Sequence, residues 1–126
     1  DGTWDAAVVG EPLTIKVEAG MVTKIKGDGS DDVKAMFVEA SRKLKPQQQE
    51  NVWTVAEFGF GMNPRARLVG NVLEDEKVQG TCYFAFGDNT SLGGHSSCGI
   101  HVTGVLKQPT VTIGDVDLLN EGDIRI

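Results

Sequence analysis

The sequence lacks long hydrophobic runs, and this absence removes one class of protein at once. No apolar stretch in the 126 residues approaches the roughly 18 residues that a transmembrane helix requires. The first residues also lack the basic and apolar regions of a signal peptide. We therefore expect no membrane partner and a cytoplasmic location.

Basic charge is also scarce. Twelve Lys and Arg stand against eighteen Asp and Glu, which gives a formal net charge of −6. Nucleic-acid affinity is built largely from Lys and Arg contacts with phosphates, so this balance argues against a nucleic-acid partner. Arg42, Lys43 and Lys45 do cluster, but at the end of a predicted helix, where they complement the helix dipole.

Cysteine and histidine are rare, with two residues of each type in the chain. Cys82 and Cys98 could form one disulfide or stay free, and without a secretory signal we expect reduced thiols. Their separation does not match the short spacing of zinc knuckles. Both cysteines and both histidines lie in the glycine-rich stretch 57–105, so a chemical site is expected there.

The length of 126 residues predicts a single domain, 1–126, with a hydrophobic core of its own. The chain has no initiating Met and runs almost directly into strand-like sequence. We therefore expect it to be part of a longer chain.

Periodicity of the apolar residues gives the expected elements. Alternation of apolar and polar residues predicts a hairpin. A helical spacing predicts one main helix, which begins at Ser30–Asp32 and is stopped by Pro46. A short helix is expected between Asn71, which would cap its start, and Gly80, which would end it. The expected elements are a hairpin over 13–25, a helix over 30–44, a surface loop over 47–51, strands over 52–60, 81–86 and 99–106, a short helix over 72–79, a loop over 88–97 and a β-meander over 110–126.

These elements do not alternate regularly between strand and helix, so the expected class is α+β with a mixed or antiparallel sheet. One main helix and one short helix accompany it. The sixteen glycines would permit a curved, barrel-like sheet.

Glu57 and His101 are the first candidates for chemistry, because each stands in an apolar strand. A buried carboxylate is costly unless a basic group, several donors or a metal compensates it. For Glu57 the choice lies between Arg65 or Arg67 as a structural partner and a role in a site. For His101 it lies between a satisfied core residue and a ligand.

Two further arrangements involve the neighbouring loop. Cys98 could pair with His95 or His101 as an activated nucleophile, which would require the base within hydrogen-bonding reach. The glycine-rich run 87–94 lacks the Lys-Ser or Lys-Thr ending of a phosphate loop, so we interpret it as a hairpin connection.

Several segments together resemble the carboxy-terminal half of the aminopeptidase T family of thermophilic metallopeptidases, a superfamily also related to the iron-dependent 2,5-dihydroxypyridine dioxygenases. The resemblance rests on segments 57–64, 70–77, 80–89, 93–94 and 100–105, which fall in the family's order. It implies that the chain is the carboxy-terminal part of such a protein.

The resemblance also implies a metal site. By motif, Glu57 and His101 fall on two ligand positions of the family, which uses a divalent zinc, cobalt, manganese or iron ion. Tyr83 stands where the family has His, and Thr103 stands where it has Asp. Neutral hydroxyl groups are poor ligands for such an ion. His95 and Asp88 are the residues that could replace the missing ligands.

The resemblance thus implies an aminopeptidase T-like metallohydrolase domain with a degraded metal site, inactive in isolation and without a tightly bound metal. We expect Glu57, Tyr83, His101 and Thr103 to come together on adjacent strands. A small peptide or other small molecule would be the substrate of an active parent protein, and a homodimer is compatible with the sequence. The alternative is a non-catalytic binding or assembly module that kept the scaffold and lost the metal.

Overall fold

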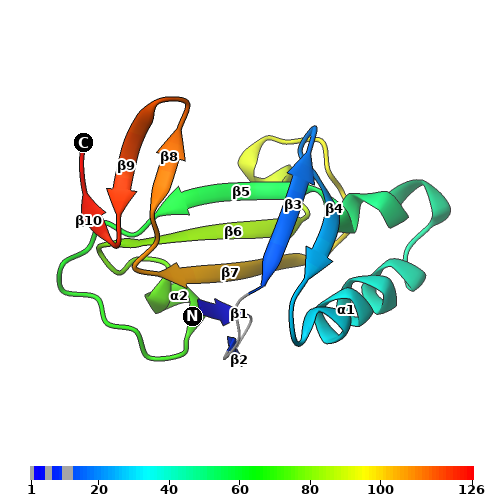
Figure 1. Ribbon diagram of the computed structural model, residues 1–126. Helices are drawn as coiled ribbons and strands as arrows, with labels where there is room; N and C mark the ends of the chain where they lie inside the picture. Colours follow the sequence, from blue (N-terminus) through cyan, green and yellow to red (C-terminus); the bar gives the residue numbers. More distant parts are fainter. Residues whose placement is uncertain (1, 5–6, 10–12) are drawn as a thin grey trace. The chain divides into compact units, whose positions relative to one another are not determined.

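A computed structural model describes residues 2–4, 7–9 and 13–126 (Figure 1). The chain divides into two compact units, both built from separate segments of the sequence. Unit 1 consists of Asp1–Gly10, Phe58–Phe84 and Thr103–Ile126, and unit 2 consists of Glu11–Glu57 and Ala85–Val102. In the part of the chain that the structure describes, no helix has the length and apolar character to cross a membrane.

Unit 2 contains a hairpin and the main helix. Strands β3 (Thr14–Glu18) and β4 (Met21–Lys26) pair antiparallel. The turn between them uses Gly20 at a φ of 78°, a left-handed conformation that glycine adopts without strain. Helix α1 (Ser30–Arg42) follows and lies beside the hairpin in Figure 1. Its first turn carries acidic residues, which favour the positive end of the helix dipole.

The core of unit 2 forms where α1 meets the 3₁₀ helix η1 (Pro46–Trp53). Phe37 of α1 is 1% exposed, and its ring packs at 4.9 Å from that of Trp53 and edge-on at 5.8 Å from that of Phe86. Helical spacing in the sequence places Phe37 on the apolar stripe of α1. This contact therefore fixes which face of α1 is buried.

Unit 1 contains several small elements: β1 (Gly2–Trp4), β2 (Ala7–Val9), α2 (Val72–Asp75), β8 (Val111–Ile113), β9 (Val116–Asn120) and β10 (Asp123–Ile124). Asn71 caps α2 by accepting a hydrogen bond from the backbone of Leu73 at 3.0 Å. The last three strands form the antiparallel meander that the sequence predicts.

Strands β5 (Val55–Phe60), β6 (Thr81–Gly87) and β7 (His101–Lys107) each pass from one unit into the other. They belong to a five-stranded sheet of order β2-β1-β7-β6-β5. At the end of β6, the backbone bonds to the residues that directly precede its two neighbours: Gly87 N–H donates to the Thr54 carbonyl before β5, and Asp88 N–H, one residue after β6, donates to the Ile100 carbonyl before β7. Such pairing joins antiparallel strands.

The α+β class, with one main helix and one short helix, is confirmed. The barrel-like closure is wrong for the described strands, which form three separate sheets. The predicted surface loop 47–51 is instead part of η1, and β5 begins at Val55. Helix α2 ends before residue 79 because the backbone at 77–79 pairs with Asn63.

Two further boundaries differ from expectation. Strand β7 begins at His101, since Gly99 adopts a φ of 69° that does not continue a strand. Strands β1 and β2 stand where the sequence predicts only a strand-like start. The expectation of a single domain over 1–126 stays a prediction.

Candidate functional site

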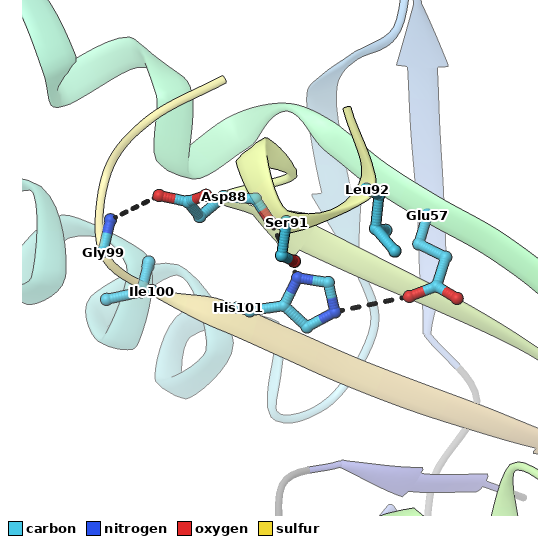
Figure 2. Close-up of a pocket in the computed structure, with 7 residues that line it drawn as sticks. All are labelled: Glu57, Asp88, Ser91, Leu92, Gly99, Ile100 and His101. Carbon is cyan, nitrogen blue, oxygen red and sulfur yellow. Dashed lines mark hydrogen bonds and ion pairs between the residues drawn. The ribbon is translucent and has the colours of Figure 1, made fainter. Parts of the chain in front are cut away.

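Two of the predicted residues meet in unit 2. Glu57 of β5 and His101, the first residue of β7, approach with 3.5 Å between carboxylate Oε2 and ring Nε2. Figure 2 shows the edge of the imidazole ring facing the carboxylate. The pair lies in a cavity of about 340 Å³ whose other lining residues are Asp88, Ser91, Leu92, Gly99 and Ile100. Both side chains are partly exposed, so a ligand from solvent could reach them.

The His101 ring is fixed by a second contact. Its Nδ1 lies 2.7 Å from the backbone carbonyl oxygen of Asp88. A carbonyl oxygen only accepts hydrogen bonds, so Nδ1 must carry the proton and donate it. In a neutral ring, Nε2 then presents its electron pair beside the Glu57 carboxylate. When Nε2 is protonated, the same two groups form an ion pair.

The Asp88 carboxylate is fully occupied by hydrogen bonds within its own loop. Oδ1 accepts from the backbone and hydroxyl of Thr90 at 2.9 and 2.6 Å. Oδ2 accepts from the backbone of Cys98 and of Gly99, each at 3.0 Å. The Thr90 hydroxyl bond, together with these backbone donors, holds the pKa of Asp88 far below its usual range. The carboxylate is thus a structural anion that ties both ends of the loop together.

These contacts bear on three possibilities that the sequence left open for the loop. Asp88 is a poor replacement for a missing metal ligand, because both of its oxygens already accept hydrogen bonds. His95 is not among the residues that line the cavity. Cys98 is not an activated nucleophile: it is buried, its thiol donates to the Ile100 carbonyl at 3.6 Å, and burial raises its pKa.

Tyr83 and Thr103 belong to unit 1. The Tyr83 ring crosses the backbone of Gly59, where a Cβ atom would lie 2.4 Å from its hydroxyl oxygen. Thr103 is buried, with 5% of its surface exposed. Their approach to Glu57 and His101 stays a prediction. Of the four residues that the sequence resemblance singled out, Glu57 and His101 meet within one unit.

Two features of the Glu57–His101 pair fit a divalent metal ion. Bonds of about 2.1 Å from an imidazole and a carboxylate to a tetrahedral ion would place the two atoms about 3.4 Å apart, close to the spacing of this pair. A ligating histidine usually donates its other ring N–H to a carbonyl or carboxylate, as His101 does. Across 2–4, 7–9 and 13–126, however, no group of three or more His, Cys, Asp or Glu side chains is placed to hold a metal. As a metal site, the pair by itself would be incomplete.

Sequence reasoning identified Glu57, His101 and Asp88 but not the residues that complete the cavity, namely Ser91, Leu92, Gly99 and Ile100. One local signal was available. An Asp followed two residues later by a backbone and hydroxyl donor, as in Asp88-Asn89-Thr90, is typical of an Asx turn. That turn begins the loop and places 3₁₀ helix η2 (Thr90–Leu92) at the cavity.

Comparison with known proteins assigns the fold to a family. The solved structure of 2,5-dihydroxypyridine dioxygenase from Pseudomonas putida KT2440 is similar, with a TM-score of 0.76 and 20% sequence identity. The similar region covers 98% of this chain and 37% of that chain, so this chain spans little more than a third of the dioxygenase. No curated protein matches the sequence.

The family model described as NicX, 2,5-dihydroxypyridine 5,6-dioxygenase, matches residues 5–126. The predicted relation to the dioxygenases is therefore confirmed, while the resemblance to aminopeptidase T stays a prediction. Since the match extends over nearly the whole sequence, the chain belongs to the NicX family.

Proposed function

We propose that this chain is a domain of a NicX-like protein in which Glu57 and His101 form an incomplete divalent-metal site, without catalytic activity of its own. One observation carries the proposal. The Asp88 carbonyl oxygen lies 2.7 Å from Nδ1 of His101, so a neutral ring would carry its proton there and present Nε2 as an electron-pair donor 3.5 Å from the Glu57 carboxylate. A metal-ligating histidine typically has this arrangement, with its other ring N–H donated to a carbonyl or carboxylate.

The ion expected in a dioxygenase-related family is iron(II), which supplies redox chemistry with oxygen when it is bound by two His and one carboxylate. Here His101 and Glu57 would hold it, while the exposed Leu92 would shield one side of the cavity from water. Catalytic sites typically use about three protein ligands. A third donor would have to come from another part of the intact protein or from a partner, so no reaction is expected from this chain alone.

Two alternatives use the same residues. The intact protein could be an aminopeptidase T-like hydrolase, in which the ion would act on water and a small peptide rather than on oxygen and a dihydroxypyridine. Alternatively, the domain is a non-catalytic binding or assembly module. The Tyr83 ring seated on Gly59 favours this second alternative, because an aromatic side chain then fills space at a position where the family has a ligand.

Calorimetric titration of zinc, and of iron(II) without oxygen, tests the proposal. The unmodified chain should bind weakly, and His101→Ala should abolish the binding. His95→Ala is the matched control, since it removes the other histidine of the chain, and it should change nothing. Restoring the family residues with Tyr83→His and Thr103→Asp should raise the affinity about tenfold or more.

The possible results separate the alternatives. Micromolar binding by the unmodified chain that is lost in His101→Ala would mean that the site is complete and the proposal of an incomplete site is wrong. No binding by any variant, including the restored one, would contradict the metal site and favour the non-catalytic module.

A further inference from the structure

The side chain of Asp88 does not reach toward Glu57 or His101, yet its backbone contacts the ring on which the site depends. The residue follows directly after β6, and its N–H donates to the carbonyl of Ile100 at 2.6 Å. Gly87 permits this approach, because a Cβ atom there would lie 2.3 Å from the same carbonyl oxygen. The backbone at Asp88 is thus held against the residue that precedes His101.

The carboxylate then fixes the loop over 88–100. Its four hydrogen bonds come from donors two, ten and eleven residues further along the chain, Thr90, Cys98 and Gly99. Figure 2 shows the bond from Gly99 reaching back across the loop to the carboxylate. A single side chain therefore sets the position of both the first turn of the loop and its return to β7.

These contacts leave the Asp88 carbonyl oxygen directed at Nδ1 of His101, at 2.7 Å. Free histidine in water prefers its neutral proton on Nε2, the opposite arrangement. A fixed carbonyl 2.7 Å from Nδ1 reverses that preference, because the Nε2 tautomer would leave the electron pairs of Nδ1 and the carbonyl facing each other at that short distance, whereas the Glu57 carboxylate lies farther from Nε2, at 3.5 Å. Reversing it turns Nε2, the nitrogen beside Glu57, into an electron-pair donor.

We propose that Asp88 is a positioning residue for His101: its carboxylate holds the loop so that its own carbonyl keeps the ring proton on Nδ1 and aims Nε2 at Glu57. The inference deepens the proposed function but concerns the ring alone, so it can hold even if no metal binds. If the carboxylate stabilised the loop without holding the Asp88 carbonyl against the ring, its removal would leave the position of the ring proton unchanged.

The test is nuclear magnetic resonance of the ring nitrogens in protein labelled with ¹⁵N-histidine, at a pH where both rings are neutral. His95→Gln assigns the signals, because the chain has two histidines. In the unmodified chain, His101 should show a protonated Nδ1 and a bare Nε2. In Asp88→Ala, the proton should move to Nε2 in most molecules.

Asp117→Asn is the matched control, because Asp117 also accepts a threonine hydroxyl bond, from Thr112 at 2.8 Å, but in the β8–β9 hairpin. It should leave the His101 signals unchanged. If Asp88→Ala does not fold, Asp88→Asn and Thr90→Val replace it, since each removes a subset of the loop bonds with little change in volume. A folded variant of either kind in which His101 keeps the proton fully on Nδ1 would overturn the proposal.

Zinc titration of the same variants separates this inference from the proposed function. Loss of an outer partner of a ligating histidine typically lowers metal affinity about 10–100-fold. A shifted ring proton in a chain that binds no metal would support the positioning role and contradict the metal site. An unchanged ring proton with weakened metal binding would do the reverse.

Discussion

Gly59 illustrates how a single residue can be required by its neighbour. A Cβ atom at this position would lie 2.4 Å from both Cζ and the hydroxyl oxygen of Tyr83. Those atoms belong to a rigid ring, so the ring or the strand must move. Gly59→Ala should therefore lower the free energy of unfolding by about 1–3 kcal/mol, the usual cost of overpacking, as measured by urea denaturation.

A double-mutant cycle identifies the cause. In a Tyr83→Ala background the ring is absent, so adding Gly59→Ala should cost almost nothing further. An equal cost in both backgrounds would show that the strand backbone, not the ring, excludes the methyl group.

The buried Cys82 thiol predicts that the stability of the folded chain falls at alkaline pH. Burial raises the pKa of its thiol from 9.0 to about 11. A raised pKa in the folded state means that its contribution to stability is complete below about pH 9 and is lost as the pH rises toward 11. Urea unfolding between these values should show the unmodified chain losing stability faster than Cys82→Ala. Parallel curves for the two proteins would contradict the raised pKa.

At the residue scale, the sequence predicted those side chains that stand out from the pattern of their immediate neighbours. Glu57 and His101 stand out as titratable side chains in apolar strands, and they do meet. The role of Asp88 could not be read in the same way, because it depends on the return of the chain at Cys98 and Gly99. Which residues meet when a loop closes is set by the tertiary structure rather than by their spacing in the sequence.

At the scale of elements, the buried face of α1 depends on Phe37. Its ring is 1% exposed and contacts the rings of Trp53 and Phe86. Phe37→Ala should lower the free energy of unfolding by about 3–5 kcal/mol through lost burial and a cavity. Val38→Ala is the matched control on the same helix, where the side chain is 37% exposed, and it should cost less than about 0.5 kcal/mol. Similar losses from both changes would mean that α1 is not anchored through Phe37.

The elements best predicted are those with a sustained period, namely the β3–β4 hairpin, α1 and the meander. The 3₁₀ helix η1 was missed because its first residues are Pro46 and a run of polar side chains, which resemble a loop. The short strands β1 and β2 carry too few residues for alternation to be recognised.

At the scale of the whole molecule, the boundaries between the two units fall inside strands. They separate Glu57 from Phe58 in β5, Phe84 from Ala85 in β6, and Val102 from Thr103 in β7. Independent domains are normally separated at exposed linkers that few contacts cross. Three uninterrupted strands in place of linkers therefore predict that the two units unfold together.

The two cysteines provide a probe for each unit, since both are buried, with Cys82 in unit 1 and Cys98 in unit 2. Cys98→Ala and Cys82→Ala each leave one thiol, and its labelling rate in increasing urea reports the free energy of opening around it. Opening β5, β6 or β7 disturbs both units, so the two thiols should become accessible in the same unfolding event. In the range where the labelling rate depends on urea, the two variants should therefore give the same free energy of opening, and the same dependence of that energy on urea concentration. The comparison is made after correcting for the global stability of each variant. A lower opening energy at one thiol, with a smaller urea slope, would show that its unit unfolds by itself and that the shared strands do not couple the two.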